Sequence, residues 1–329
     1  SRMNIKDSSL YDVFLSELRR KIPRGAELTT TLTDMLYLER EAVYRRLRGD
    51  VPFTFMEVVT IAKKLGISLD NLADSDALKS RPFQLKLVEY ANPLEADFKM
   101  MQNFVEILAY ARKEPDWEAG FSTNILPKCF YYYYPNITRF YLFKWLYQYS
   151  DVDTMKPFRD VGSCDRVKKI QREFLREVRE IRSCYFIFDH LVFRYLVTDI
   201  LFFVSINLIT PEELKVLQAE LLELLEGMER FVAKGCYDDT GNEIYVYLSN
   251  INLDTSYCYL GGQNYHLSML KAFTLNSITS FDVETFHRLK NWMSSLKRSS
   301  TLISVSGEKE RVRFFNDQRC LVQEMTDTI

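Results

Sequence analysis

The first eighty residues carry a succession of short helical segments, and this pattern constrains the fold more than any other feature of the 329-residue chain. Apolar residues recur three and four positions apart, as they do on the buried face of an amphipathic helix. Gly49 and Gly66 each end a segment, while Thr54 and Glu57 have the spacing of a capping box at the start of the fourth. We therefore predict five helices that form a separate domain over residues 1–76.

The second and third segments have the spacing of a helix-turn-helix, in which two helices pack about a short turn. Apolar Leu32, Leu36 and Val43 supply the contacts between them. The third segment, residues 40–48, then faces outward with a tyrosine and four arginines against one acid, Glu41; these residues are Arg40, Tyr44, Arg45, Arg46 and Arg48. Arginine donates paired hydrogen bonds to guanine or pairs with phosphate, and a short helix fits the major groove. The pattern favours contact with double-stranded DNA.

The stretch from Leu32 to Gly49, together with the run Ala-Lys-Lys-Leu-Gly-Ile-Ser-Leu-Asp-Asn-Leu at 62–72, resembles the Cro/repressor-type helix-turn-helix family, also called the XRE family. The resemblance covers about residues 10–75. It implies a five-helix, lambda-repressor-like DNA-binding domain. It also implies DNA contacts from the start of the second helix, the turn and the third helix, through Thr30, Thr31, Glu39, Arg40, Glu41, Tyr44, Arg45 and Arg48. Arg46, on the outward surface described above, completes the predicted set of DNA-binding residues.

The turn departs from the family pattern at two positions. Tyr37 replaces the usual glycine, and Glu39 replaces the Ser or Thr that caps the third helix. Because a tyrosine at positive φ is strained, we predict a remodelled turn. Residues 1–80 also hold 13 basic and 12 acidic side chains, so the domain is not cationic overall. These features leave open a protein-interaction adaptor that uses the same fold without binding DNA.

Residues 77–329 are predicted to form a second domain that is helical over 83–235 and α+β over 236–329, after a polar linker at 74–82. We interpret the apolar stretch 185–209 as a buried core helix, because its charged residues make a membrane span unfavourable. A capping box at Thr210 opens a helix that Gly235 ends. Its leucines, spaced in heptads, either pack within the chain or form a dimer seam.

From residue 243 onward, apolar residues alternate with period two, which is typical of strands. We predict a strand at 243–250, a hairpin across Gly261 and Gly262, a helix from Asp282 and a second hairpin over 301–315. The fold class is therefore mainly α, and α+β overall. The five-helix N-terminal domain is followed by a large helical region that ends in a small antiparallel sheet.

Catalytic and metal-binding motifs do not stand out. The three histidines lie in separate segments, the six cysteines are far apart, and the sequence has no P-loop or G-x-S-x-G pattern. We therefore expect no enzyme activity, cofactor or metal. The aromatic run that begins at Tyr131 and reaches Tyr147 indicates either core packing or an aromatic-lined pocket for a small effector.

The net charge of −2 excludes whole-molecule basicity as a route to nucleic acid, so DNA binding has to come from a local surface. Widely spaced cysteines and the lack of a signal-peptide pattern favour a cytoplasmic protein. Together with the resemblance, these points predict a homodimeric, sequence-specific transcriptional regulator. Its C-terminal domain would dimerise and sense a small-molecule or protein effector. An enzyme-like C-terminal domain tethered to DNA remains a further alternative.

Overall fold

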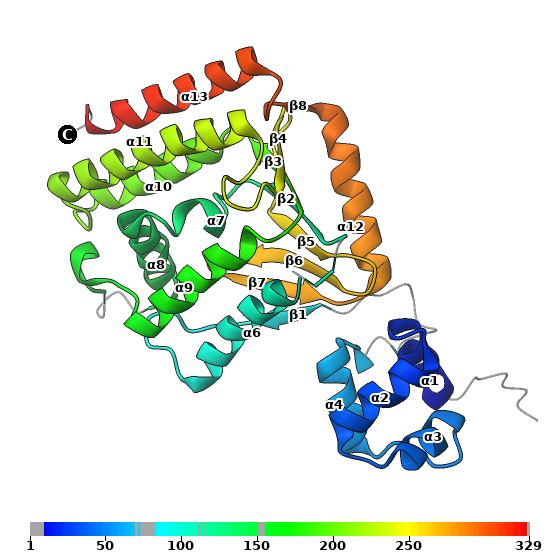
Figure 1. Ribbon diagram of the computed structural model, residues 1–329. Coiled ribbons are helices and arrows are strands. Elements are labelled where there is room, and N and C mark those ends of the chain that lie inside the picture. The colour runs from blue at the N-terminus through cyan, green and yellow to red at the C-terminus, as the bar shows by residue number, and fades with distance from the viewer. Residues whose placement is uncertain are drawn as a thin grey trace, which may run out of the picture. The chain divides into compact units, whose positions relative to one another are not determined.

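A computed structural model of the protein describes residues 10–69, 72, 83–111, 113–114, 116–150 and 155–327. The chain divides into two compact units, an N-terminal unit of residues 1–83 with 280–285 and a C-terminal unit of residues 84–279 with 286–329 (Figure 1). The predicted linker at 74–82 and the predicted domain boundary between residues 76 and 77 lie outside the described residues.

The N-terminal unit is helical, as predicted, with helices α1 (Leu10–Lys21), α2 (Gly25–Leu36), α3 (Arg40–Arg48) and α4 (Phe55–Leu65). The fifth helix predicted near residues 68–72 lies partly outside the described residues. One apolar core holds the four helices together, because each helix buries the side chains that recur three and four residues apart. The buried core residues are Phe14, Leu15, Leu18, Leu28, Leu32, Met35, Val43, Leu47, Phe53, Ile61, Ala62 and Ile67.

The C-terminal unit is built on a mixed sheet of eight strands in the order β1-β7-β6-β5-β2-β3-β4-β8. The strands are β1 (Gln84–Lys86), β2 (Glu118–Thr123), β3 (Ser183–Asp189), β4 (Glu243–Ser249), β5 (Tyr257–Gly261), β6 (His266–Ala272), β7 (Asn276–Ser280) and β8 (Ser300–Leu302). Strands β2, β3 and β4 run parallel at the centre. The β2–β5, β5–β6, β1–β7 and β4–β8 pairs are antiparallel.

Helical crossovers connect the parallel strands. Between β2 and β3 lie α7 (Lys128–Tyr131), α8 (Pro135–Tyr149), the 3-10 turn η2 (Phe158–Asp160) and α9 (Asp165–Val178). Between β3 and β4 lie α10 (Val192–Ser205) and α11 (Pro211–Lys234). The other helices are α6 (Glu95–Ala111), α12 (Val283–Leu296) and α13 (Glu308–Gln323), with short 3-10 turns η3 (Lys297–Ser299) and η4 (Glu324–Thr326).

The two faces of the sheet are covered by different helices (Figure 1). On one face, Phe130 of α7 packs edge-on against Phe186 and Phe188 of β3. On the other face, Phe286 and Met293 of α12 pack with alternate sheet residues such as Ile187. Because successive side chains of a strand point to opposite faces, the continuous apolar run of β3 contributes buried side chains to the helix layers on both faces of the sheet.

The prediction for residues 83–235 was wrong in part, since strands β1, β2 and β3 lie within this supposedly helical region. The stretch 185–209 is not one helix: its first residues belong to β3, and α10 begins at Val192. A central parallel strand is buried on both faces, so its sequence lacks the alternation that identifies a half-exposed strand. The sheet is accordingly larger than predicted, and mixed rather than antiparallel.

The hairpin predicted over 301–315 was also wrong. Only β8 is a strand, and the chain then enters α13 after Gly307, which has φ 66°. The buried residues of α13 recur with helical spacing, as Arg311, Phe314, Phe315, Gln318 and Val322. The strand at 243–249, the β5–β6 hairpin and the helix after Asp282 are confirmed.

Helix α11 shows the predicted capping box, in which Thr210 Oγ1 accepts from the Glu213 N–H at 3.2 Å and the Glu213 carboxylate accepts from the Thr210 N–H at 2.8 Å. Its leucine positions are buried and the helix packs against α8 and α13 of the same chain. Gln218 also donates to the carbonyl oxygen of Val322, at 2.9 Å. The leucine seam is therefore internal and is not available for a dimer.

Candidate nucleic-acid interface

The family resemblance placed Thr30 and Thr31 at the start of the second helix. Helix α2 begins at Gly25, so both residues lie in its middle. The Thr30 hydroxyl donates to the Ala26 carbonyl at 3.0 Å. Because this hydrogen bond to the carbonyl four residues earlier satisfies the hydroxyl inside a helix, threonine can occupy an interior helical position as well as a cap. The predicted start of the helix was for this reason too late in the chain. Thr30 is exposed and Thr31 is half-buried, so both lie at or near the surface.

The turn between α2 and α3 keeps a left-handed residue although no glycine is present. Tyr37 adopts φ 55° and ψ 39°, with 91% of its surface exposed. The prediction of a remodelled turn was therefore wrong, since the tyrosine accepts the strained conformation. Glu39 is extended, at φ −63° and ψ 145°, and its carboxylate makes no capping hydrogen bond to α3. That carboxylate is exposed beside the first turn of the helix.

Helix α3 is held in place from its inner side. Val43 and Leu47 are buried in the core, and the Arg19 guanidinium donates to the Leu47 carbonyl at 2.9 Å. Gly49 ends the helix at φ 82°, and its N–H bonds the carbonyl oxygens of Arg45 and Arg46. One face of α3 is thus fixed, while the opposite face is presented to solvent.

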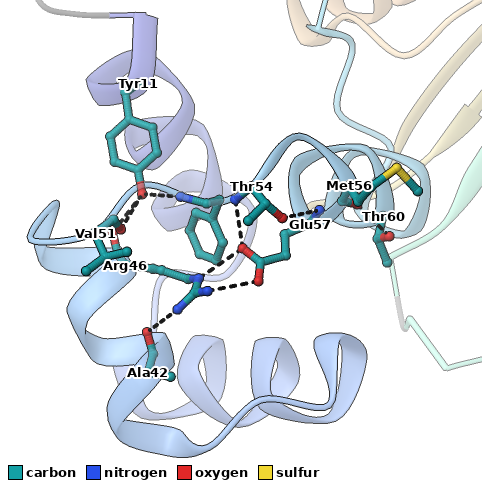
Figure 2. A network of polar contacts seen from close by, with 9 residues as sticks. Tyr11, Ala42, Arg46, Val51, Thr54, Met56, Glu57 and Thr60 are labelled. Atoms are coloured by element: carbon teal, nitrogen blue, oxygen red, sulfur yellow. Dashed lines mark hydrogen bonds and ion pairs between the residues drawn. The ribbon is translucent and has the colours of Figure 1, made fainter.

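Arg46 belongs to the fixed side of α3. Its guanidinium donates two hydrogen bonds to the Glu57 carboxylate, at 2.9 and 3.0 Å, and a third to the Ala42 carbonyl at 3.2 Å (Figure 2). Both charged side chains are only 15% exposed. A two-pronged pair of this kind fixes geometry as well as contributing energy. Arg46 therefore ties α3 to the start of α4, and its donors are already engaged.

Tyr11 and the α4 capping box extend this network (Figure 2). The Tyr11 hydroxyl donates to the Arg46 carbonyl at 2.9 Å and accepts from the Phe53 N–H at 3.1 Å. Glu57 also accepts from the Thr54 N–H at 2.8 Å. Burial alone would raise the pKa of Glu57, but the hydrogen bonds from Arg46 and Thr54 outweigh it and hold the pKa below its ordinary value. The carboxylate is thereby kept charged.

The outward face of α3 brings together the remaining predicted residues, which are Arg40, Glu41, Tyr44, Arg45 and Arg48, all exposed. Arg48 lies 3.0 Å from the Asp50 carboxylate and 3.6 Å from that of Glu41, so its charge is partly offset. Within the described part of the chain, the Arg40 and Arg45 guanidinium groups have no ion-pair partner. These two cations are free to meet an anionic surface.

The sequence thus identified the exposed face of α3 but not the residues that hold it. Arg40 and Arg45 lie as predicted, whereas Arg46 has turned inward to Glu57. Tyr11 and Glu57 were missed as supports. The capping box predicted that Glu57 lies in the first turn of a helix. The spacing of residues in the sequence does not indicate that the same carboxylate contacts an arginine from another helix.

Asp189 and two histidines of the C-terminal unit lie in structured surroundings. Asp189 ends β3 and is fully buried, and its two oxygens accept from the N–H groups of Leu191 and Leu253, each at 2.8 Å. It therefore fixes two loops. His266 and His287, distant in sequence, have ring centroids 5.6 Å apart. Over the described residues, no three His, Cys, Asp or Glu side chains are grouped to hold a metal ion.

Comparison with known families finds that residues 15–111 match the model of the BetR domain. The match begins within α1, includes the helix-turn-helix and ends with α6, so it covers less than a third of the chain. It supports a DNA-binding, helix-turn-helix regulatory segment, and it does not single out the XRE family. No curated protein and no solved structure matches the chain.

The helices of the protein differ in length and apolar character. None of those in the described ranges combines the length and apolar character that crossing a bilayer requires.

Proposed function

We propose that the protein is a sequence-specific DNA-binding transcriptional regulator whose N-terminal unit presents α3 to the major groove. The observation that carries the proposal is the division of α3 into two faces. The Arg46–Glu57 pair, Leu47 and Val43 hold the inner face, and Arg40 and Arg45 are left exposed without partners in the described residues. The BetR match over the same helices supports this assignment.

Arg45 and Arg40 are the proposed principal contacts. Arginine bonds two acceptors of guanine through its planar fork, or pairs with phosphate. Tyr44, which is 37% exposed, lies on the same surface and offers a hydroxyl and an aromatic ring. Arg48 would reach phosphate only by leaving Asp50, and Arg46 is omitted because it is engaged by Glu57. Thr30 on α2 is the proposed contact beside the groove.

The proposed regulator acts as a dimer, as expected where two recognition helices meet half-sites about 34 Å apart. Since the α11 leucines are buried within the chain, the dimer contact has to use another surface. The C-terminal unit is the proposed location of both this contact and an effector site. An effector would change DNA affinity only by binding one arrangement of the dimer better than the other.

An adaptor function is the second candidate, and specific residues favour it. Glu39 and Glu41 place two carboxylates at the first turn of α3, and the Asp50 carboxylate forms an ion pair with Arg48. Such a mixed surface suits a protein partner better than a phosphate backbone. A DNA-binding α3 requires the glutamates to stand clear of phosphate or to accept from cytosine amino groups.

Selection from a random duplex library at near-physiological salt separates the two candidates. The full chain is incubated with the library, and bound fragments are sequenced. Enrichment of an inverted repeat is the expected result, and its spacing reports the dimer geometry. Enrichment of no sequence, both with and without added cell extract to supply an effector, would contradict the DNA-binding proposal and favour the adaptor.

A further inference from the structure

Helix α9 of the C-terminal unit has a strongly basic outer face. Its apolar side packs against α6 and α7, which leaves the opposite side to solvent (Figure 1). Asp165, its first residue, is the one exposed acid among the described residues 165–178. The exposed cations of the same helix number five, and they are Arg166, Lys168, Lys169, Arg172 and Arg176. The outer face is therefore cationic, although the whole chain has a net charge of −2.

The other carboxylates of α9 lie mostly below this outer face. Glu173 accepts a hydrogen bond from the side chain of Gln102, on α6, at 3.3 Å. The Glu177 side chain is only 7% exposed, and its carboxylate lies 3.6 Å from the Arg176 guanidinium. Both carboxylates are thus held toward the interior, and the groups that reach farthest into solvent are the cations.

Exposed ion pairs offset the outer cations only weakly. Lys168 lies 4.0 Å from the Asp165 carboxylate, and Lys169 lies 4.0 Å from that of Glu173. Solvent screens pairs at this distance on an exposed helix. Among the residues that the structure describes, Arg172 has no ion-pair partner. Most of the positive charge on the outer face is therefore available to another molecule.

Three of the cations form the accessible centre of this face. Lys169, Arg172 and Arg176 are three and four residues apart, so they share one side of the helix. Arg166 differs from them, because its guanidinium donates two hydrogen bonds to the Glu95 carboxylate, at 2.7 and 3.0 Å. That pair ties α9 to α6, and Arg166 is therefore left out of the proposed contact.

The composition of the outer face selects the kind of partner. Among the described residues, none of the large apolar side chains of α9 is exposed. A helix that lies on a membrane presents large apolar side chains to the lipid, and the core of a protein interface is depleted of charged residues. A row of cations without apolar neighbours instead matches a polyanion that carries phosphates at regular intervals. Charge complementarity therefore favours nucleic acid over a membrane or a protein.

We propose that the outer face of α9 binds the phosphate backbone of duplex DNA, as a second contact besides α3. Lys169, Arg172 and Arg176 each neutralise a phosphate, and the release of counter-ions from the DNA drives this binding. Contacts to phosphate position a protein on the duplex but carry no direct sequence information. The choice of DNA as the nucleic acid rests on the proposed regulatory function, whereas the basic face does not.

Binding of the full chain to a short duplex of scrambled sequence tests the contact. The test variant combines Lys169→Gln, Arg172→Gln and Arg176→Gln. Fluorescence anisotropy measures affinity between about 50 and 200 mM salt. We expect the affinity to fall at least tenfold. The slope of log affinity against log salt should fall in magnitude by about 2 to 3, because each lost phosphate contact removes about 0.9.

The matched control removes the same charge from exposed positions on α11 and α13, through Lys215→Gln, Lys309→Gln and Arg313→Gln. It should change the affinity less than twofold. A further variant keeps the charge of the outer face, through Lys169→Arg, Arg172→Lys and Arg176→Lys, and should bind like the parent protein. Parent-like affinity and slope in the test variant, equal loss in the control, or weak binding by the charge-preserving variant would overturn the contact.

The scrambled duplex and the library selection separate this contact from the proposed function. An enriched sequence together with unchanged binding by the test variant would overturn the α9 contact alone. Binding to the scrambled duplex that the test variant loses, with no enriched sequence, would support the α9 contact and contradict sequence-specific regulation. Binding of the parent protein to vesicles of phosphatidylcholine and phosphatidylserine, and not to the duplex, would overturn DNA as the partner of α9.

Discussion

Arg40 and Arg45 lie on one short helix, whereas Phe130 and Phe186 meet from a helix and a strand that are far apart in the chain. The first pair is placed by helical periodicity, which fixes which side chains share a face once the helix is known. The second pair is placed by the packing of α7 on the sheet. Local periodicity therefore reveals the exposed charged face of α3, whereas only the tertiary fold reveals the aromatic core of the C-terminal unit.

The two units also differ in what stabilises them. The N-terminal unit is a small helical core supported by a partly buried ion pair, while the C-terminal unit packs aromatic side chains on both faces of a sheet. Substitutions in the two cores should act separately, because each core belongs to its own unit.

Phe186→Ala should destabilise the C-terminal unit by about 3–5 kcal/mol, since a fully buried aromatic ring is replaced by a cavity. Phe186 packs with its ring centroid 4.9 Å from that of Phe121 and 5.0 Å from that of Phe130. Urea denaturation followed by near-ultraviolet circular dichroism measures the loss. Leu32→Ala is the matched substitution in the other core. If both variants shifted one common transition equally, the two units would not be independent.

Glu57→Gln should cost the N-terminal unit about 2–3 kcal/mol, because it leaves the Arg46 guanidinium poorly paired in a half-buried place. The measurement is thermal unfolding of the full chain, followed by the helical signal. Glu41→Gln is the control, because the Glu41 side chain is 74% exposed and solvent screens its pair with Arg48. Equal effects of the two substitutions would contradict the supporting role of Glu57.

Glu41 and Glu57 illustrate which features of this protein the sequence predicts and which it does not. Periodicity and capping residues predicted α1 to α4, α11, β4 and the β5–β6 hairpin. Strand β3 was read as helix because burial on both faces removes the alternation of a strand. The exposed arginines of α3 were predicted, but the turning of Arg46 toward Glu57 depends on how two helices cross. The packing of Phe130 on Phe186 depends on how α7 crosses the sheet.

Tyr37→Gly should stabilise the N-terminal unit by about 1 kcal/mol. Tyr37 is left-handed and almost fully exposed, so glycine removes the strain without removing a buried contact. The melting temperature of the variant measures the gain. Tyr37→Ala should show no such gain, because alanine keeps the β-carbon that causes the strain. Stabilisation by alanine as large as that by glycine would refute this explanation.

The smallest predicted effect is the pH dependence due to Glu57. Its pKa is lowered in the folded protein, so its contribution to stability is present above the ordinary glutamate pKa and is lost as the pH falls through the folded value. Unfolding curves of the parent and Glu57→Gln should therefore converge as the pH is lowered below about 4.5. A difference in stability between the two proteins that stayed constant down to pH 3 would show that the ionised Glu57 carboxylate is not the source of that difference.

The most direct test of the central claim compares two neighbouring arginines on an enriched duplex. Arg45→Ala should weaken binding by about 1–3 kcal/mol, relax sequence preference and leave the melting temperature unchanged. Arg46→Ala should lower the melting temperature and, where the unit is still folded, retain most of the affinity. Fluorescence anisotropy at several salt concentrations measures both variants. The opposite result, with Arg45→Ala binding like the parent protein and Arg46→Ala folding normally but failing to bind, would contradict the assignment of the two faces of α3.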